Sequence, residues 1–172
     1  MAIIKRTNGC LPKIDDSCFL AENAAIIGDV VMGKDCSVWF GAVIRGDVNS
    51  IRIGDLVNIQ DNATIHATYK QTKTVIGNKV SIGHNAVVHG CTIHDNVLVG
   101  MGALVMDNCV IESNSLIAAG AVLTQGTHVG ENELWAGVPA KKIGPLPKSL
   151  NKERIEEIAQ NYKLYASFYN QE

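Results

Sequence analysis

Three of the five histidines in this 172-residue sequence, His66, His84 and His89, lie close together along the chain. Neutral imidazoles are good ligands for divalent zinc, and a site with three of them leaves a fourth position open for water. Zinc held in this way lowers the pKa of water to about 7 and so supplies a nucleophile at neutral pH. Whether the three rings can share a metal depends on the elements that carry them.

A hydrophobic residue returns at every sixth position through most of the chain. This period fits neither a 3.6-residue helix nor a simple two-faced strand, and it is typical of a parallel β-helix. Each six residues predict one short strand and its corner. The nineteen repeats begin at Leu20, Ile26, Met32, Val38, Ile44, Ile53, Ile59, Ile65, Ile76, Ile82, Val88, Ile93, Val99, Val105, Ile111, Ile117, Leu123, Val129 and Trp135.

Three such strands close one coil, so equivalent positions three repeats apart stack at about 4.8 Å. Nineteen repeats predict about six coils. The spacing lengthens between Ile44 and Ile53 and again between Ile65 and Ile76. These two breaks predict loops at corners, the longer of them covering residues 67–75.

The repeat ends after Trp135 in the segment WAGVPAKKIGPLP, whose prolines and glycines stop strand propagation. A helix capped by Ser149 is expected to follow, with an apolar stripe at Ile155, Ile158, Tyr162, Tyr165 and Tyr169. We therefore predict an all-β fold, a parallel β-helix over residues 1–147, followed by a C-terminal α-helix over residues 148–172 that packs on its outer face.

Composition narrows the class of partner. The net charge of −2 gives no basic face for nucleic acid or an anionic membrane. No apolar run approaches the roughly 20 residues of a membrane span, and the N-terminus has no signal-peptide core. Five cysteines without a CxxC pair suggest neither a disulfide framework nor a thiolate zinc site, and Cys36 and Cys109 fall at small core positions. We expect a cytoplasmic protein without nucleic-acid or membrane partners.

Counting repeats places the histidines. His66 and His89 hold the second position of repeats one coil apart, so they stack on one face, and Arg45 lies one coil earlier in the same column. His84 belongs to the preceding wall, which it shares with Gln60. A neighbouring subunit in a threefold assembly would bring His84 to the other two rings.

The alternatives are ordinary surface roles. A single outward histidine on such a fold is usually a polar surface residue, as we expect for His94 and His128. Arg45 and Asp47 are either a solvated pair or a buried ion pair between subunits.

The stretches VIRGDVNSIRIG, NIQDNATIH and SIGHNAVVHGCTI resemble the γ-class carbonic anhydrases and the wider γ-carbonic-anhydrase-like family, from about Ile14 to the terminal helix. The resemblance implies a left-handed β-helix, a homotrimer, and metal-dependent hydration of carbon dioxide to bicarbonate. It implies zinc, or ferrous iron or cobalt, as cofactor. The implied site residues are the metal ligands His66, His84 and His89, the interfacial pair Arg45 and Asp47, the water-ordering Gln60 and Asp61, and the helix residue Tyr162.

The sequence departs from the founding members of that family in its proton shuttle. The predicted loop over residues 67–75 contains no Asp or Glu, and Val48 follows the RGD where a glutamate is expected. Two other functions therefore stay open. One is a hexapeptide acyltransferase that uses acyl-coenzyme A and a single histidine as general base, and the other is a non-catalytic metal-binding scaffold of the same fold.

Overall fold

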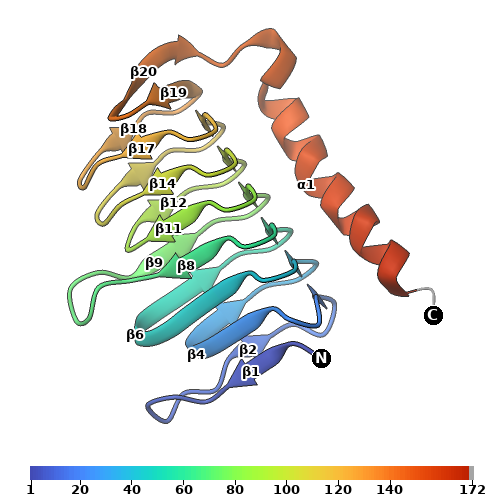
Figure 1. The fold of residues 1–172 in the computed structure, drawn as a ribbon. Helices are drawn as coiled ribbons and strands as arrows, with labels where there is room; N and C mark the ends of the chain where they lie inside the picture. The colour runs from blue at the N-terminus through green and yellow to red at the C-terminus, as the bar shows by residue number, and fades with distance from the viewer. Residues whose placement is uncertain (171–172) are drawn as a thin grey trace.

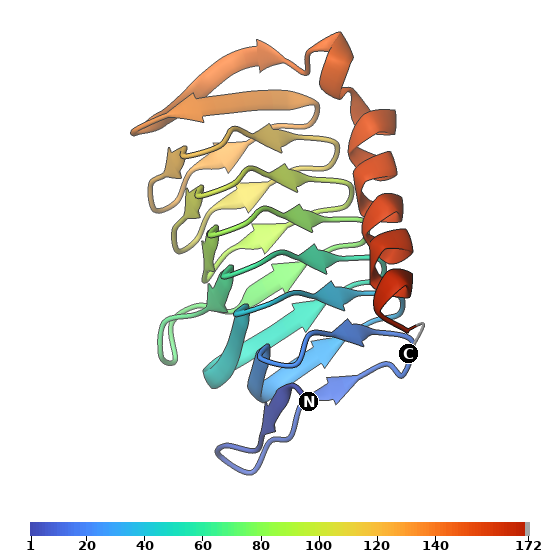
Figure 2. The same cartoon turned by 45° about the vertical axis from the view of Figure 1, so that its right-hand side comes forward.

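The computed structural model describes residues 1–170 as a parallel β-solenoid with one long helix along its side (Figures 1 and 2). Short strands follow one another around three walls. Wall 1 contains β1 (Ile3–Lys5), the first parts of β4 (Ala25–Met32) and β6 (Val43–Ile53), then β8 (Thr64–His66), β11 (Val87–His89), β14 (Leu104–Val105) and β17 (Val122–Leu123).

The other two walls repeat this pattern. Wall 2 contains β2 (Lys13–Ile14), the second parts of β4 and β6, then β9 (Thr74–Ile76), β12 (Thr92–Ile93), β15 (Val110–Ile111) and β18 (His128–Val129). Wall 3 contains β3 (Phe19–Leu20), β5 (Ser37–Val38), β7 (Asn58–Ile59), β10 (Ser81–Ile82), β13 (Leu98–Val99), β16 (Leu116–Ile117) and β19 (Glu133–Gly137). An antiparallel strand, β20 (Ala140–Pro145), closes the stack.

Each wall of the described chain therefore holds seven parallel strand segments, which gives about seven turns. The repeat count predicted about six. The difference lies at the N-terminus, where β1 and β2 pair with β4 although they precede the first regular repeat. The predicted parallel β-helix with one C-terminal helix is confirmed.

The corner between walls 1 and 2 differs from the prediction. Instead of a loop between Ile44 and Ile53, β6 continues through the corner as one strand beside β4. At Gly28, φ is +78°, and an added Cβ would collide with the carbonyl of Gly46 on the next coil. Glycine there lets the two extended strands bend together. The second break, between Ile65 and Ile76, does form a loop, here called the excursion over residues 67–73. It is shorter than predicted, because β9 already begins at Thr74.

The core is one continuous stack of inward side chains. Seventeen of the nineteen repeat residues are buried, and the other two, Leu20 and Trp135, pack partly buried against them. Cys36 and Cys109 are buried in the same stack, as their small-residue positions predicted. Because successive residues of a strand point to opposite faces, this inward set fixes which residues point outward.

The helix α1 (Lys152–Ser167) runs along wall 3 from the last turns back toward the first (Figures 1 and 2). The predicted cap at Ser149 is wrong, because Ser149 lies in a short 3-10 helix, η1 (Lys148–Leu150). The cap is Asn151, whose side chain accepts the backbone N–H of Arg154 at 3.0 Å. A second 3-10 helix, η2 (Phe168–Asn170), follows.

The face that α1 buries is narrower than the predicted stripe. Ile155 is buried together with Ala159 and Ala166, whereas Tyr165 and Tyr169 are exposed. The small alanines allow the helix backbone to approach β5, β7 and β10, which α1 contacts. No helix among residues 1–170 is long and apolar enough to cross a membrane.

Candidate metal centre

His66 and His89 end neighbouring strands of wall 1 and stand side by side. β8 and β11 pair in register, with His66 opposite His89 and the buried Ile65 opposite Val88. Both imidazoles therefore point outward, and His66 Nδ1 lies 3.1 Å from His89 Nε2. Arg45 lies one coil earlier in the same outward column, because the residue before it, Ile44, pairs with Ile65.

A carboxylate holds the far nitrogen of His66. Its Nε2 lies 3.2 Å from Asp47 Oδ1, and the other carboxylate oxygen accepts a hydrogen bond from Arg45 Nη1 at 2.6 Å. Burial opposes ionisation of Asp47, but the hydrogen bonds from Arg45 and His66 outweigh it and lower the pKa of this carboxyl. Burial, with a smaller contribution from the charge of Arg45, also lowers the pKa of His66. The neutral ring that metal ligation requires is thereby favoured.

A second carboxylate holds His89 in the same way. His89 Nδ1 lies 2.9 Å from Oδ1 of Asp107, which comes from the next coil of wall 1. Asp107 also accepts hydrogen bonds from the hydroxyls of Thr68 and Thr72, at 2.8 and 2.9 Å. Burial alone would raise the pKa of Asp107, yet these bonds together bring it below its ordinary value.

The two facing nitrogens suit a cation. When each ring gives its N–H to its carboxylate, His66 Nδ1 and His89 Nε2 both present lone pairs to each other. Two lone pairs at 3.1 Å repel unless a positive centre lies between them. Two nitrogens bound to one tetrahedral zinc at about 2.0–2.1 Å each are about 3.3–3.4 Å apart, so the observed spacing is close to that of a metal pair.

His84 lies at a different place, at the corner that follows β10 on wall 3. Its Nδ1 is 2.8 Å from Asp61 Oδ2, and its backbone N–H donates to Gln60 Oε1 at 3.2 Å. Its Nε2 faces the hydroxyl of Tyr162 on α1 at 3.5 Å. Burial first, and then the charge of Asp61, raises the pKa of Tyr162 to about 12, so this hydroxyl keeps its proton at neutral pH.

The predicted site residues thus form two groups within one chain. Arg45, Asp47, His66 and His89 make a continuous polar network on wall 1, and His84 joins Gln60, Asp61 and Tyr162 between wall 3 and the helix. Among the described residues, no three His, Cys, Asp or Glu side chains converge on one point where they could hold a metal.

Sequence reasoning missed Asp107, Thr68 and Thr72. Asp107 occupies the third position of the Val105 repeat, where the chain turns a corner, so the repeat count alone gives no direction for its side chain. A signal does exist one coil earlier. At Gly90, directly after His89, an added Cβ would collide with Asp107 and with Thr72, so the glycine clears the space for their contacts.

Comparisons with known proteins bear on this geometry. Residues 73–107 and 90–125 match the family described as bacterial transferase hexapeptide (six repeats). The chain is 50% identical over 146 residues to a probable carbonic anhydrase of Methanocaldococcus jannaschii, which covers 85% of this chain and 89% of that protein. It is 43% identical over 159 residues to mitochondrial gamma carbonic anhydrase 2 of Arabidopsis thaliana. The chain belongs to the γ-carbonic-anhydrase-like family of hexapeptide-repeat proteins.

Members of the γ-carbonic-anhydrase-like family differ in length. The Arabidopsis match covers 90% of this chain but only 56% of that protein. A solved hexapeptide transferase family protein from Anaplasma phagocytophilum superposes with a TM-score of 0.92 at 42% identity, covering 97% of this chain and 98% of the other. Close relatives of one architecture therefore carry both the anhydrase and the transferase names.

Proposed function

We propose that this protein catalyses the reversible hydration of carbon dioxide to bicarbonate at a divalent metal shared between subunits of a homotrimer. His66 and His89 of one subunit and His84 of the next would hold the metal, which is zinc, ferrous iron or cobalt. When bound, zinc supplies a nucleophile at neutral pH by lowering the pKa of water from about 15.7 to about 7.

One observation carries this proposal. Each of the three histidines has one ring nitrogen against a carboxylate, at 3.2 Å for His66, 2.8 Å for His84 and 2.9 Å for His89. Carboxylate partners on the far nitrogen are the usual support of metal-binding histidines, because they fix the ring orientation and keep the ligating nitrogen free of its proton. The surface histidines His94 and His128 also face a carboxylate, but they share the single residue Glu112 and are more exposed. The three candidate ligands each have a carboxylate of their own, and the free nitrogens of His66 and His89 face each other at 3.1 Å.

The remaining residues have roles that follow from their contacts. Gln60 is 4% exposed and fixed by hydrogen bonds on both ends of its amide, to Asn58 and to the backbone of His84. It can orient a small molecule beside His84 without itself moving. Tyr162 keeps its proton and can donate a hydrogen bond at the same place.

The interface follows from the separation of the two groups. A trimer that places the corner of His84 against the neighbour's wall 1 would close each site and cover Arg45 and Asp47, which are 42% and 26% exposed in the single chain. Arg45 would then stabilise the trimer and, through its hydrogen bond to Asp47, hold the ring of His66 in position.

The test is metal analysis of the purified protein followed by carbon dioxide hydration assays with zinc, cobalt and anaerobic iron. Hydration should require metal and should be lost in His66→Ala, His84→Ala and His89→Ala. His94→Ala is the matched control, because His94 is exposed on wall 2. Activity in metal-depleted protein, or none with any of the three metals, would contradict the proposal.

The transferase name of the Anaplasma relative supports a second candidate, acyl transfer with one histidine as general base. The number of essential histidines separates the two functions, since acyl transfer needs one and metal hydration needs three. Metal binding by all three histidines without any turnover would favour the scaffold function.

A further inference from the structure

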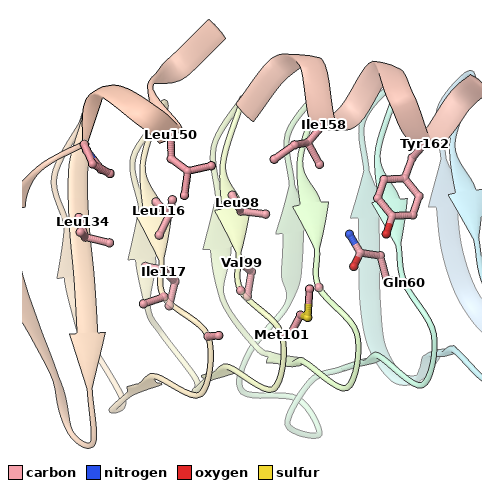
Figure 3. Close-up of a pocket in the computed structure, with 15 residues that line it drawn as sticks. Gln60, Leu98, Val99, Met101, Leu116, Ile117, Leu134, Leu150, Ile158 and Tyr162 are labelled. Carbon is pink, nitrogen blue, oxygen red and sulfur yellow. The ribbon is translucent and has the colours of Figure 1, made fainter. Parts of the chain in front are cut away.

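An apolar cavity of about 470 Å³ lies between wall 3 and the C-terminal segment, away from the charged network of wall 1 (Figure 3). Its floor is a column of three leucines, Leu98, Leu116 and Leu134, which pair in register on β13, β16 and β19. Leu150 of η1 and Ile158 of α1 form its roof.

The cavity is elongated along the solenoid axis and has one polar end. Gln60 and Tyr162 lie at that end, as Figure 3 shows, and Leu134 and Leu150 lie at the other. Gln60 follows β7, four strands from β19 along wall 3, so the span is about 19 Å at the interstrand spacing. None of the described residues that line the cavity carries a charge.

The helix leaves this space open because it packs elsewhere. α1 contacts β5, β7 and β10, whereas the leucine column lies on the strands beyond them. A cavity of this size with apolar walls and a few polar groups at one end has the features of a small-molecule site.

We propose that this cavity binds one elongated, uncharged acyl compound, such as an ester or thioester. Its hydrocarbon chain lies along the leucine column and its carbonyl oxygen accepts hydrogen bonds from Gln60 and Tyr162. Gln60 Nε2 donates one N–H to Asn58 and has a second to offer, and the tyrosine hydroxyl supplies another donor. A free carboxylate would meet no charged lining residue here, and the carboxylate of Asp61 beside His84 would repel it, so its burial is costly.

The site is separate from the metal ligands but adjoins one of them. Gln60 and Tyr162 both contact His84, so a carbonyl group seated between them would lie beside that ring. A bound acyl compound should therefore inhibit carbon dioxide hydration, if the proposed function holds. Binding itself needs no metal, so the two proposals can fail independently.

The probe is the methyl ester of a conjugated polyene fatty acid, whose fluorescence rises in apolar surroundings. It is titrated into the purified protein before and after removal of metal with a chelator. We expect saturable binding of one ester per subunit in both preparations. The corresponding free acid should bind about tenfold more weakly or worse, because its charge must be buried.

A matched pair of variants locates the bound probe. Leu116→Trp fills the floor of the cavity and should weaken ester binding about tenfold or more, since the displaced methylene groups lose their apolar surroundings. Leu164→Trp makes the same change at a helix position that is 53% exposed and should leave binding intact. If Leu116→Trp fails to form folded protein, Ile158→Trp fills the cavity from the roof.

Three results would overturn the site: no saturable binding of the ester, binding that both filling variants leave unchanged, or equal affinity for the ester and the free acid. Hydration measured on the same preparations tests the proposed function separately. Protein that hydrates carbon dioxide but binds no ester would refute the acyl site alone.

Discussion

Asp107 accepts a hydrogen bond from His89 across the boundary between two coils, with 2.9 Å between its Oδ1 and the ring Nδ1. The same carboxylate receives the hydroxyls of Thr68 and Thr72, and Thr72 also accepts the backbone N–H of Thr68. The excursion over residues 67–73 is thus tied through one carboxylate to the orientation of a candidate ligand. A residue outside the recognised motif thereby sets the tautomer of His89.

Asp107→Asn should weaken metal binding by about 10- to 100-fold, the usual effect of removing a hydrogen-bond partner of a metal-binding histidine. Asparagine keeps the size of the side chain but lacks the charge that favours the N–H on His89 Nδ1. Titration of the metal-free protein with cobalt, followed by its visible absorption, measures the affinity directly. Asp16→Asn makes the same change at an exposed position and should bind cobalt normally. Equal affinities would show that Asp107 does not position His89.

The proposed site shared between subunits makes a quantitative prediction for mixed trimers. His84→Ala and His66→Ala should each lose metal binding alone, whereas a mixed trimer regains one complete site of three. With equal amounts and random assembly, about three quarters of the trimers are mixed, so about one quarter of all sites should recover. Refolding the two variants together and counting bound zinc per chain gives the result.

The control for this experiment is the pair His66→Ala and His89→Ala. These two residues lie on one chain and pair in register, so no arrangement of the two variants rebuilds a site. Recovery in both mixtures, or in neither while mixed trimers demonstrably form, would refute a site shared in this way.

The parts of this protein that obey one local rule were predictable from its sequence. Every inward repeat residue follows the same six-residue period, and counting that period correctly places His66 beside His89. The corners between walls follow no such rule. The sequence therefore predicted neither that β6 runs through a bend nor that Asp107 turns toward His89.

The C-terminal helix was also predictable only in part. Its existence and its burial at Ile155 follow from the apolar spacing, but its capping residue and its distance from wall 3 do not. These depend on the length of the segment that connects β20 to α1 and on the small side chains at Ala159 and Ala166. The cavity beside Tyr162 therefore had no signature in the sequence.

Arg45→Ala should weaken the proposed trimer more than Lys73→Ala does. Arg45 is bonded to Asp47 at 2.6 Å on the face that we assign to the interface, and removing one partner of a pair buried in an assembly costs about 3–5 kcal/mol. Lys73 is an exposed residue of the 67–73 excursion, where substitutions usually cost about 0.5 kcal/mol or less. Sedimentation velocity across a dilution series would compare the two. Identical dissociation would place Arg45 outside the interface.

Proton export should limit the hydration rate at low buffer concentration. The excursion over residues 67–73 contains no carboxylate, and its exposed large hydrophobic side chain is Tyr69, at 59%. Stopped-flow hydration at constant pH and ionic strength should therefore accelerate as imidazole is added, because the buffer takes the proton that no side chain carries away. Tyr69→Glu should raise the rate at low buffer and reduce the response to imidazole. Val31→Glu, which adds a carboxylate to an exposed position of wall 2, should do neither. An active enzyme that ignores buffer concentration would mean that another group already carries the proton, and Tyr69→Glu would then leave the rate unchanged.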